Sequence, residues 1–212
     1  RFRTKVGGTR VPDAVEEDFT YQTLLSSWPI TVERLVPALC KAARERKVNT
    51  SWLHPHTEHE IALASFAERI LEHRRFLDDF EDFTSRLAWQ GALNAVSQML
   101  LKVAAAGVPD FYQGTETWNL RLVDPDNRID VDHDAHARLL EGLEEAEPVD
   151  LWRAWRDGRI KLWTTSRAPA FRNVRTRLFR DGRYIPVQVA GPREAHVIAF
   201  ARRLGRAWSL LA

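Results

Sequence analysis

Hydrophobic side chains recur at the spacing of helical turns through the first half of the chain. Four sets follow the i, i+3, i+4, i+7 pattern that places side chains on one face of an α-helix. The sets are Val32, Leu35, Val36, Leu39, Cys40 and Ala43; Leu63, Phe66, Ala67, Ile70 and Leu71; Phe76, Phe80, Phe83 and Leu87; and Ala92, Ala95, Val96, Met99, Leu100 and Val103. These stripes predict a layer of helices whose apolar faces form a core.

The first predicted helix carries three further signals. Thr31 directly precedes the apolar pattern and is a suitable N-cap residue. Pro37 lies inside the pattern, so we expect it to kink the helix or to break it into two pieces. Cys40 shares the apolar face, which indicates a small core residue and not a nucleophile.

The hydrophobic pattern changes at Gly107. Residues 107–114 form a short apolar run between glycines without a helical period, which predicts one buried strand. A polar, turn-rich stretch follows over 115–132 and contains the sequence Asp124-Pro125-Asp126-Asn127. Because long loops inside compact domains often carry function, this stretch is a candidate site.

Helical patterns return after this loop, and short strands are expected at the end of the chain. We expect one helix over 135–145, ended by Pro148, and another over 162–179, although Pro169 lies within it. The strands are expected after the turn at 181–182, where Ile185, Val187 and Val189 alternate, and at 197–201 and 207–211, which flank a turn with Gly205 and predict a hairpin.

The composition of the chain excludes several classes of protein. A hydrophobic fraction of 44% over 212 residues excludes wholesale disorder, and the single cysteine excludes an intramolecular disulfide. No apolar stretch approaches the ~20 residues of a membrane span, and no signal peptide is visible, so we expect a cytoplasmic location and no membrane partner. The chain begins with Arg1 instead of Met and ends in an apolar stretch, which suggests a fragment.

The net charge of +2 hides an uneven distribution. Residues 151–212 carry 13 arginines and Lys161 against three acidic residues, a net charge of +11, which leaves −9 for residues 1–150. Such a segment is compatible with nucleic-acid binding or with docking on an acidic protein surface. No RNA-binding signature or aromatic stacking motif accompanies the arginines, so we do not expect a nucleic-acid partner.

The polar loop contains the strongest candidate chemistry. Asp124, Asp126, Asp130, Asp132 and Arg128 could bind sugar hydroxyls, or they could simply provide good turn chemistry. In the same region, aromatic rings could pack on a sugar ring or belong to the core. These rings are Tyr112 and Trp118.

Other candidate sites are weaker. His54, His56 and His59 could ligate a metal ion, but no cysteine or second histidine pair supports them, so we expect no metal. His133-Asp134 has no nucleophile motif nearby. The chain contains no phosphate-binding loop or dinucleotide fingerprint, and we expect no cofactor.

Two strings in this region resemble those of a known enzyme family. Residues 107–116, GVPDFYQGTE, and residues 122–128, LVDPDNR, resemble the maltooligosyltrehalose synthases, which belong to the alpha-amylase family of glycoside hydrolases. Further strings look like the same synthases and occur in the same order along the chain. They lie at 19–25, 28–29, 49–52, 161–163 and 195–202.

The resemblance implies a mainly α fold with few short strands, as the C-terminal fragment of a (β/α)₈-barrel enzyme. It implies a helical subdomain over 1–106, the last strand-loop-helix unit of the barrel over 107–180, and the start of an antiparallel β domain over 181–212. The motifs that carry the three catalytic carboxylates of the family are not found in this chain. We therefore expect no catalytic residue here and no activity of the fragment alone.

The reaction implied by the resemblance is an isomerisation of maltooligosaccharides. The full enzyme would convert the reducing-end α-1,4 linkage into an α,α-1,1 linkage, with the rest of its own chain as a partner of this segment. The implied substrate-binding residues are Tyr112, Glu116, Trp118, Asp124, Asp126, Asn127 and Arg128. An alpha-amylase-type hydrolase remains an alternative, as does a non-catalytic module that binds nucleic acid or protein through its basic C-terminal face.

Overall fold

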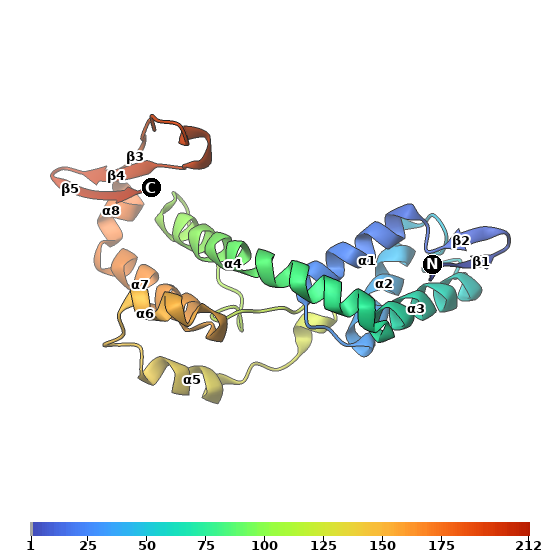
Figure 1. Cartoon of the computed structure of the whole chain (residues 1–212). Helices are drawn as coiled ribbons and strands as arrows, with labels where there is room; N and C mark the ends of the chain where they lie inside the picture. Colours follow the sequence, from blue (N-terminus) through green and yellow to red (C-terminus); the bar gives the residue numbers. More distant parts are fainter. Residues whose placement is uncertain (1) are drawn as a thin grey trace. The chain divides into compact units, whose positions relative to one another are not determined.

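The computed structural model describes residues 2–212 of the chain. These residues form two compact units. The N-terminal unit comprises the residues up to Trp89 together with Leu120–Asp130, and the C-terminal unit comprises Gln90–Asn119 and Val131–Ala212. The chain is mainly helical with short antiparallel strands, which confirms the predicted fold class in outline (Figure 1).

The N-terminal unit is built from a hairpin, three complete helices and the start of a fourth. The hairpin, which the hydrophobic pattern does not predict, pairs Thr4 with Val11 and Val6 with Thr9. The elements are β1 (Thr4–Val6), β2 (Thr9–Val11), α1 (Ala14–Ser27), α2 (Val32–Arg46), α3 (Thr57–Glu72) and α4 (Arg74–Ala104), with a 3-10 turn at Asp126–Arg128. Buried core side chains come from the hairpin and all these helices and include Val11, Leu24, Leu35, Phe66 and Phe80.

The apolar pattern misses α1 because four of its five buried side chains are polar. Thr20, Thr23 and Ser27 are buried, and each hydroxyl donates to the backbone carbonyl four residues earlier. Bonds within the helix satisfy these hydroxyls, so they can be buried without a partner elsewhere. The helix starts with a capping box, in which Asp13 and Glu16 each accept the other's backbone N–H at 2.9 Å.

Helix α2 confirms the first predicted helix and corrects one detail. Leu35 and Leu39 are buried as expected, and Cys40 is half-buried, which raises the pKa of its thiol. Thr31 occupies the N-cap position, but its side chain makes no capping hydrogen bond. Of the two predicted effects of Pro37, the break is wrong, because Pro37 lies inside one continuous helix, and the kink stays a prediction. A proline removes one backbone donor, and the packing of the apolar face outweighs that loss.

The remaining predicted faces lie on α3 and α4. Helix α3 buries its apolar stripe, whereas the faces expected over 76–87 and 92–103 belong to one continuous helix, α4. Phe80 is buried, but Phe83 is 47% exposed and Leu87 is 40% exposed, so these two are not core residues. Two successive apolar faces can lie on one helix or on two helices. The apolar period alone does not distinguish these cases.

The C-terminal unit contains the end of α4, four shorter helices and a three-stranded sheet. The elements are α5 (His133–Glu141), α6 (Pro148–Arg153), α7 (Arg159–Val174), α8 (Thr176–Asp181), β3 (Arg183–Pro186), β4 (Phe200–Leu204) and β5 (Ala207–Leu211), with 3-10 turns at Trp155–Asp157 and Glu194–His196. The strands pair antiparallel in the order β3-β4-β5. The predicted hairpin is confirmed, with Phe200 opposite Leu211 and Gly205 at φ 58° in its turn, but its first strand lies over 200–204 instead of 197–201. The strand expected to include Val187 and Val189 ends before them, at Pro186.

The prediction of a strand over 107–114 is wrong. These residues form irregular backbone, and Val108 is 96% exposed. A strand is stabilised by hydrogen bonds to neighbouring strands. In the sheets of residues 2–212, β1 pairs with β2, and β4 pairs with both β3 and β5. The apolar run therefore has no strand beside it.

The helices of the last third are shorter than predicted. The expected helix over 135–145 ends at Glu141, and Pro148 does not end it but occupies the first turn of α6, where a missing N–H costs nothing. The expected helix over 162–179 is two helices, because α7 ends at Val174 and α8 starts at Thr176. Pro169 lies inside α7 and does not interrupt it.

Arginines of the basic segment anchor the C-terminal unit. Arg172 donates to the carbonyls of Val103, Ala105 and Gly107, where α4 ends. Arg202 is buried and donates to Phe179 O at 2.6 Å and Gly182 O at 2.9 Å. Cations at a helix C-terminus satisfy carbonyls that have no partner within the helix. These two arginines therefore act within the unit and not as a free basic surface.

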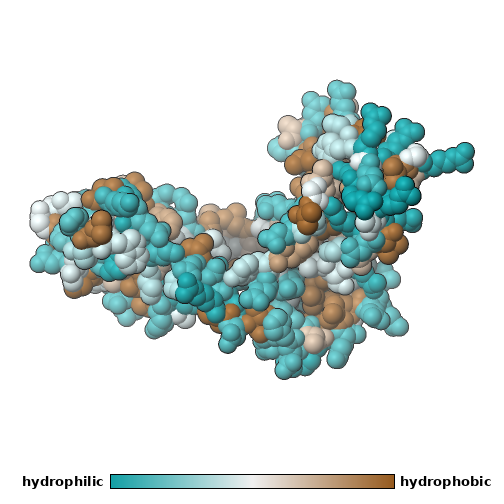
Figure 2. Space-filling view, turned by 180° about the vertical axis from the view of Figure 1, so that it is seen from behind, coloured by the Kyte–Doolittle hydropathy of each residue, from teal (hydrophilic) through white to brown (hydrophobic). Residues whose placement is uncertain are grey.

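Exposed hydrophobic side chains occur on both units. Leu53 is 87% exposed in the N-terminal unit, and Val108 is 96% and Val174 81% exposed in the C-terminal unit. Figure 2 shows hydrophobic residues scattered among hydrophilic ones on the face in view. Within residues 2–212, no helix combines the length and hydrophobicity that a membrane crossing requires.

Candidate functional site

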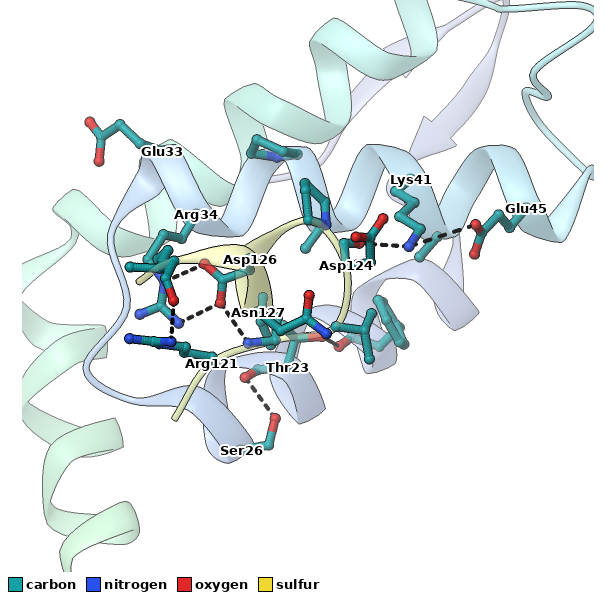
Figure 3. Close-up of a pocket in the computed structure, with 18 residues that line it drawn as sticks. Thr23, Ser26, Glu33, Arg34, Lys41, Glu45, Arg121, Asp124, Asp126 and Asn127 are labelled. Carbon is teal, nitrogen blue, oxygen red and sulfur yellow. Dashed lines mark hydrogen bonds and ion pairs between the residues drawn. The ribbon is translucent and has the colours of Figure 1, made fainter. Parts of the chain in front are cut away.

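An open groove of about 820 Å³ lies in the N-terminal unit (Figure 3). Its walls are α1, α2 and the segment 120–130, which belongs to the predicted polar loop. Phe19 contributes a side chain that is 43% exposed, and Lys41, Glu45 and Asn127 contribute charged and amide groups. The Thr23 and Ser26 hydroxyls donate to backbone carbonyls of α1. An apolar surface bordered by charged and amide groups is a combination that can bind sugar rings and their hydroxyls.

A bidentate ion pair holds the segment 120–130 on α2. Arg34 Nε and Nη2 each donate to the Asp126 carboxylate at 2.8 Å, and Nη2 also donates to Leu120 O at 2.8 Å. The Leu122 amide donates to Asp126 Oδ2 at 2.6 Å. The hydrogen bonds from Arg34 outweigh the effect of burial and lower the pKa of Asp126. The Asp126 carboxylate therefore holds the loop in place.

Two further charged side chains contact Asp124 of this segment. Lys41 donates to Asp124 O at 2.6 Å, which gives α2 a second link to the segment. Arg128 forms an ion pair with the Asp124 carboxylate, and their side chains are 74% and 50% exposed. Asn127 borders the groove. A pair as exposed as Arg128–Asp124 contributes little to stability.

A second polar cluster lies in the C-terminal unit, on the stretch 115–119. Glu116 Oε2 is buried without a hydrogen-bond partner, and the Nδ1 atom of the His136 ring lies 3.7 Å away from it. Thr117 Oγ1 lies 3.4 Å from the other ring nitrogen, Nε2, of the same histidine. Helix α5 carries His136, and its N-cap Asp132 accepts the Ala135 N–H at 2.8 Å. The cluster brings a carboxylate, an imidazole and a hydroxyl together.

The stretch 115–119 is fixed against the start of α7. Lys161 Nζ donates to Thr117 O at 2.9 Å, and the Trp118 indole N–H donates to Trp155 O at 2.7 Å. Burial, followed by the nearby charge of Lys102, lowers the pKa of Lys161. Trp118 packs against the core residues Leu143, Leu151, Ile160 and Leu162. Its indole N–H and part of its ring are thus engaged within the unit.

The seven predicted substrate-binding residues fall into two groups. Asp124, Asp126, Asn127 and Arg128 lie in the N-terminal unit, and Tyr112, Glu116 and Trp118 lie in the C-terminal unit. Tyr112 is 53% exposed. Their role in substrate binding stays a prediction for all seven.

Sequence reasoning missed three residues that hold these groups in place. Arg34, Lys41 and His136 contact the predicted residues or their backbone, but none belongs to a motif. Arg34 and Asp126 are 92 positions apart in the sequence. In a single sequence, no local spacing connects two such residues, whereas Lys161 could be found through the string at 161–163.

The three histidines proposed as metal ligands have other surroundings. His59 is buried, and its Nε2 lies 2.8 Å from Glu16 Oε1. The ring of His56 stacks 6.0 Å from that of His59, and His54 is exposed. In the part of the chain that the structure covers, no three potential metal-ligating side chains come together.

The chain is similar to maltooligosyl trehalose synthases in sequence and in structure. It is 31% identical over 198 residues to a protein of Mycobacterium tuberculosis named as a candidate maltooligosyl trehalose synthase, and this match covers 90% of the chain. A crystal structure of a maltooligosyl trehalose synthase superposes with a TM-score of 0.81 at 31% identity over 88% of the chain. The enzyme of Arthrobacter ramosus gives a TM-score of 0.77 at 34% identity over 88% of the chain.

The similarity extends over only part of these relatives. The chain spans 24% of the Mycobacterium tuberculosis protein, and 26% and 24% of the two solved structures. No family model matches the chain. The resemblance predicted from the sequence strings is confirmed, because the same enzyme is found by sequence and by structure over about nine tenths of the chain.

Proposed function

We propose that this chain is part of an enzyme that isomerises the reducing-end α-1,4 linkage of a maltooligosaccharide to an α,α-1,1 linkage. The observation that carries the proposal is the agreement of sequence and structure with maltooligosyl trehalose synthases over nine tenths of the chain. The product would be a maltooligosyl trehalose, a step in trehalose biosynthesis. Neither nucleic-acid binding nor a purely structural role accounts for that agreement.

The chain would supply part of the sugar-binding surface and not the catalytic carboxylates. In this proposal, residues 107–180 belong to the last strand-loop-helix unit of a (β/α)₈ barrel, between residues 1–106 as a helical subdomain and residues 181–212 as the start of a β domain. A barrel strand needs a neighbour on each side, which is consistent with the irregular backbone of 107–114 in the described chain. Contacts with other parts of the enzyme would provide the neighbouring strands.

The reaction requires a pocket that holds glucose and excludes water. A carboxylate elsewhere in the enzyme would attack the anomeric carbon and form a covalent glycosyl-enzyme, which the cleaved glucose would then displace. Holding that glucose in place supplies an effective molarity of roughly 10⁵–10⁸ M in favourable cases, so it can outcompete water. Glu116, Tyr112 and Trp118 would bind this glucose, and Asp126 with Arg34 would keep the loop 120–130 closed.

The partial coverage of the relatives supports the rest of the enzyme as a partner of this chain. The chain spans 24% of the Mycobacterium tuberculosis protein and 26% of a solved structure that it matches. The proposal includes a cytoplasmic location and maltooligosaccharide as the substrate. It includes neither a metal ion nor a cofactor.

The assay is the conversion of maltopentaose by the full-length protein that carries this chain. We expect reducing ends to disappear while little free glucose forms, because the α,α-1,1 product has no reducing end. Free glucose and shorter maltooligosaccharides with intact reducing ends would instead identify an alpha-amylase-type hydrolase. As a control, residues 1–212 alone should show no turnover, and measurable turnover would contradict the absence of catalytic carboxylates.

A further inference from the structure

The Glu116 carboxylate has an unusual environment. Glu116 Oε2 is one of three buried side-chain polar atoms without a hydrogen-bond partner in residues 2–212. The side chain as a whole keeps 34% of its surface exposed, so its two oxygens differ in environment. A buried carboxylate oxygen without a donor is costly. A group that can donate to Oε2 is therefore expected beside it.

His136 is placed to be that donor. Its Nδ1 lies 3.7 Å from Glu116 Oε2, and its Nε2 lies 3.4 Å from Thr117 Oγ1. If the threonine hydroxyl donates to Nε2, the ring proton of a neutral histidine must be on Nδ1, facing the carboxylate. The order hydroxyl, imidazole and carboxylate thus selects one tautomer.

The backbone that carries Glu116 and Thr117 is held from the other side. Lys161 donates to Thr117 O at 2.9 Å. A Cβ on Gly158 would lie 3.1 Å from the Thr117 side chain and 3.3 Å from the Trp118 amide nitrogen, so the stretch packs closely on the start of α7. With its backbone fixed in this way, the Glu116 carboxylate can be oriented by a single further contact.

We propose that His136 is a positioning residue that orients the Glu116 carboxylate toward a sugar hydroxyl. His136 Nδ1–H donates to Oε2, and the other oxygen, Oε1, accepts from a hydroxyl of the maltooligosaccharide. Both histidine contacts are longer than ideal hydrogen bonds, and such contacts tighten when substrate binds. This role rests on the proposed function, because that function supplies the sugar.

The tautomer of His136 tests the geometry without any assay of activity. The full-length protein is labelled with ¹⁵N at histidine, and the His136 signals are assigned by their loss in His136→Asn. Above the pH at which the ring is protonated, we expect the Nδ1–H tautomer, the minor form of free histidine. Thr117→Val should shift His136 toward Nε2–H. The Nε2–H tautomer in the unaltered protein would overturn the proposal.

Kinetics with maltopentaose test the positioning role. His136→Ala should raise KM about tenfold, which corresponds to the loss of one hydrogen bond to a charged group. In His136→Asn the side-chain amide can replace Nδ1–H, so KM should return to within about threefold of the original. In His136→Gln the amide reaches the Nε2 position instead, and KM should stay high. Equal KM values for Ala and Asn, or no change with Ala, would overturn the proposal.

The two proposals fail in different ways. If the unaltered protein forms only glucose and shorter maltooligosaccharides, the proposed function fails, and the tautomer of His136 is still measured. If the protein forms the non-reducing product but His136 is the Nε2–H tautomer, the function stands and the positioning role fails. Thermal unfolding of each variant shows whether a rise in KM comes from misfolding, because His136→Gln and His136→Asn should melt within a few degrees of each other.

Discussion

Asp126 and Glu116 are carboxylates from the same predicted sugar-binding region, but their surroundings differ. Asp126 accepts two hydrogen bonds from Arg34 and one from the Leu122 amide, all at 2.8 Å or less. Glu116 has one buried oxygen without a donor, and the Nδ1 atom of His136 lies 3.7 Å from that oxygen. A carboxylate whose two oxygens both accept hydrogen bonds from the protein fixes a loop, whereas a carboxylate with an oxygen that lacks a donor can bind a ligand.

The largest effect is expected from removing the anchor of the segment 120–130. Asp126→Ala leaves Arg34 without its carboxylate and Leu122 without an acceptor, and should lower the free energy of unfolding by ~2–3 kcal/mol. Amide hydrogen exchange should then increase over 120–130, and in the full-length enzyme more glucose should be released. Unchanged exchange at Leu122 would show that Asp126 does not hold this segment.

The next largest effect tests how closely the Glu116 stretch packs on α7. Gly158 has φ 80°, and an added Cβ would press on Thr117 and the Trp118 amide. Gly158→Ala should lower the free energy of unfolding by ~1–3 kcal/mol because the backbone and the contact are both unfavourable. Gly142→Ala is the matched control, because its φ is −92° and nothing lies within 4 Å of the added atom. Equal stability of the two variants would contradict the close packing.

Acid should affect the N-terminal unit through two carboxylates. At Asp13, the Glu16 amide, Arg46 and Asn49 outweigh burial and lower the pKa to about 2, from 3.8. Arg44 lowers the pKa of Glu60 to about 2, from 4.5. The stabilisation from these two ionised carboxylates is fully present above the pKa values that they have in the unfolded chain.

This stabilisation should be lost as the pH falls from about 4.5 to 2, because the unfolded chain then binds more protons than the folded one. Thermal unfolding at pH 5 and pH 2.5 measures the loss, and Glu60→Gln should reduce the difference. An equal pH dependence of Glu60→Gln and the original chain would show that Glu60 does not contribute.

The smallest effect is expected at Arg128. Among residues 2–212, the Arg128 side chain forms an ion pair only with the exposed carboxylate of Asp124. Arg128→Ala should therefore change the free energy of unfolding by less than ~0.5 kcal/mol, as measured by denaturant unfolding. A loss comparable with that of Asp126→Ala would mean that Arg128 also anchors the segment.

Local sequence patterns predict much of the helical architecture, and they fail where tertiary contacts decide. The apolar stripes of α2 and α3 are directly visible in the sequence. Helix α1 is missed because Thr20, Thr23 and Ser27 are buried with their hydroxyls bonded inside the helix. The run 107–114 has the composition of a strand, but a strand also requires neighbours that the composition does not reveal.

The candidate site shows the same limit. The strings around Glu116 and Asp126 identify the region, but they do not separate an anchoring carboxylate from one with a spare acceptor. That distinction depends on Arg34 and His136. Arg34 is 92 positions away from Asp126 in the sequence, and His136 lies outside any motif. Only the spatial arrangement reveals it.

The most direct test of this account is the ratio of free glucose to non-reducing product that the full-length protein with Glu116→Gln forms from maltopentaose. Replacing the carboxylate weakens the hold on the cleaved glucose, so water competes better for the glycosyl-enzyme. We predict that the ratio rises several-fold while the thermal unfolding midpoint is nearly unchanged. A ratio equal to that of the unaltered protein would contradict the role of Glu116 in sugar binding.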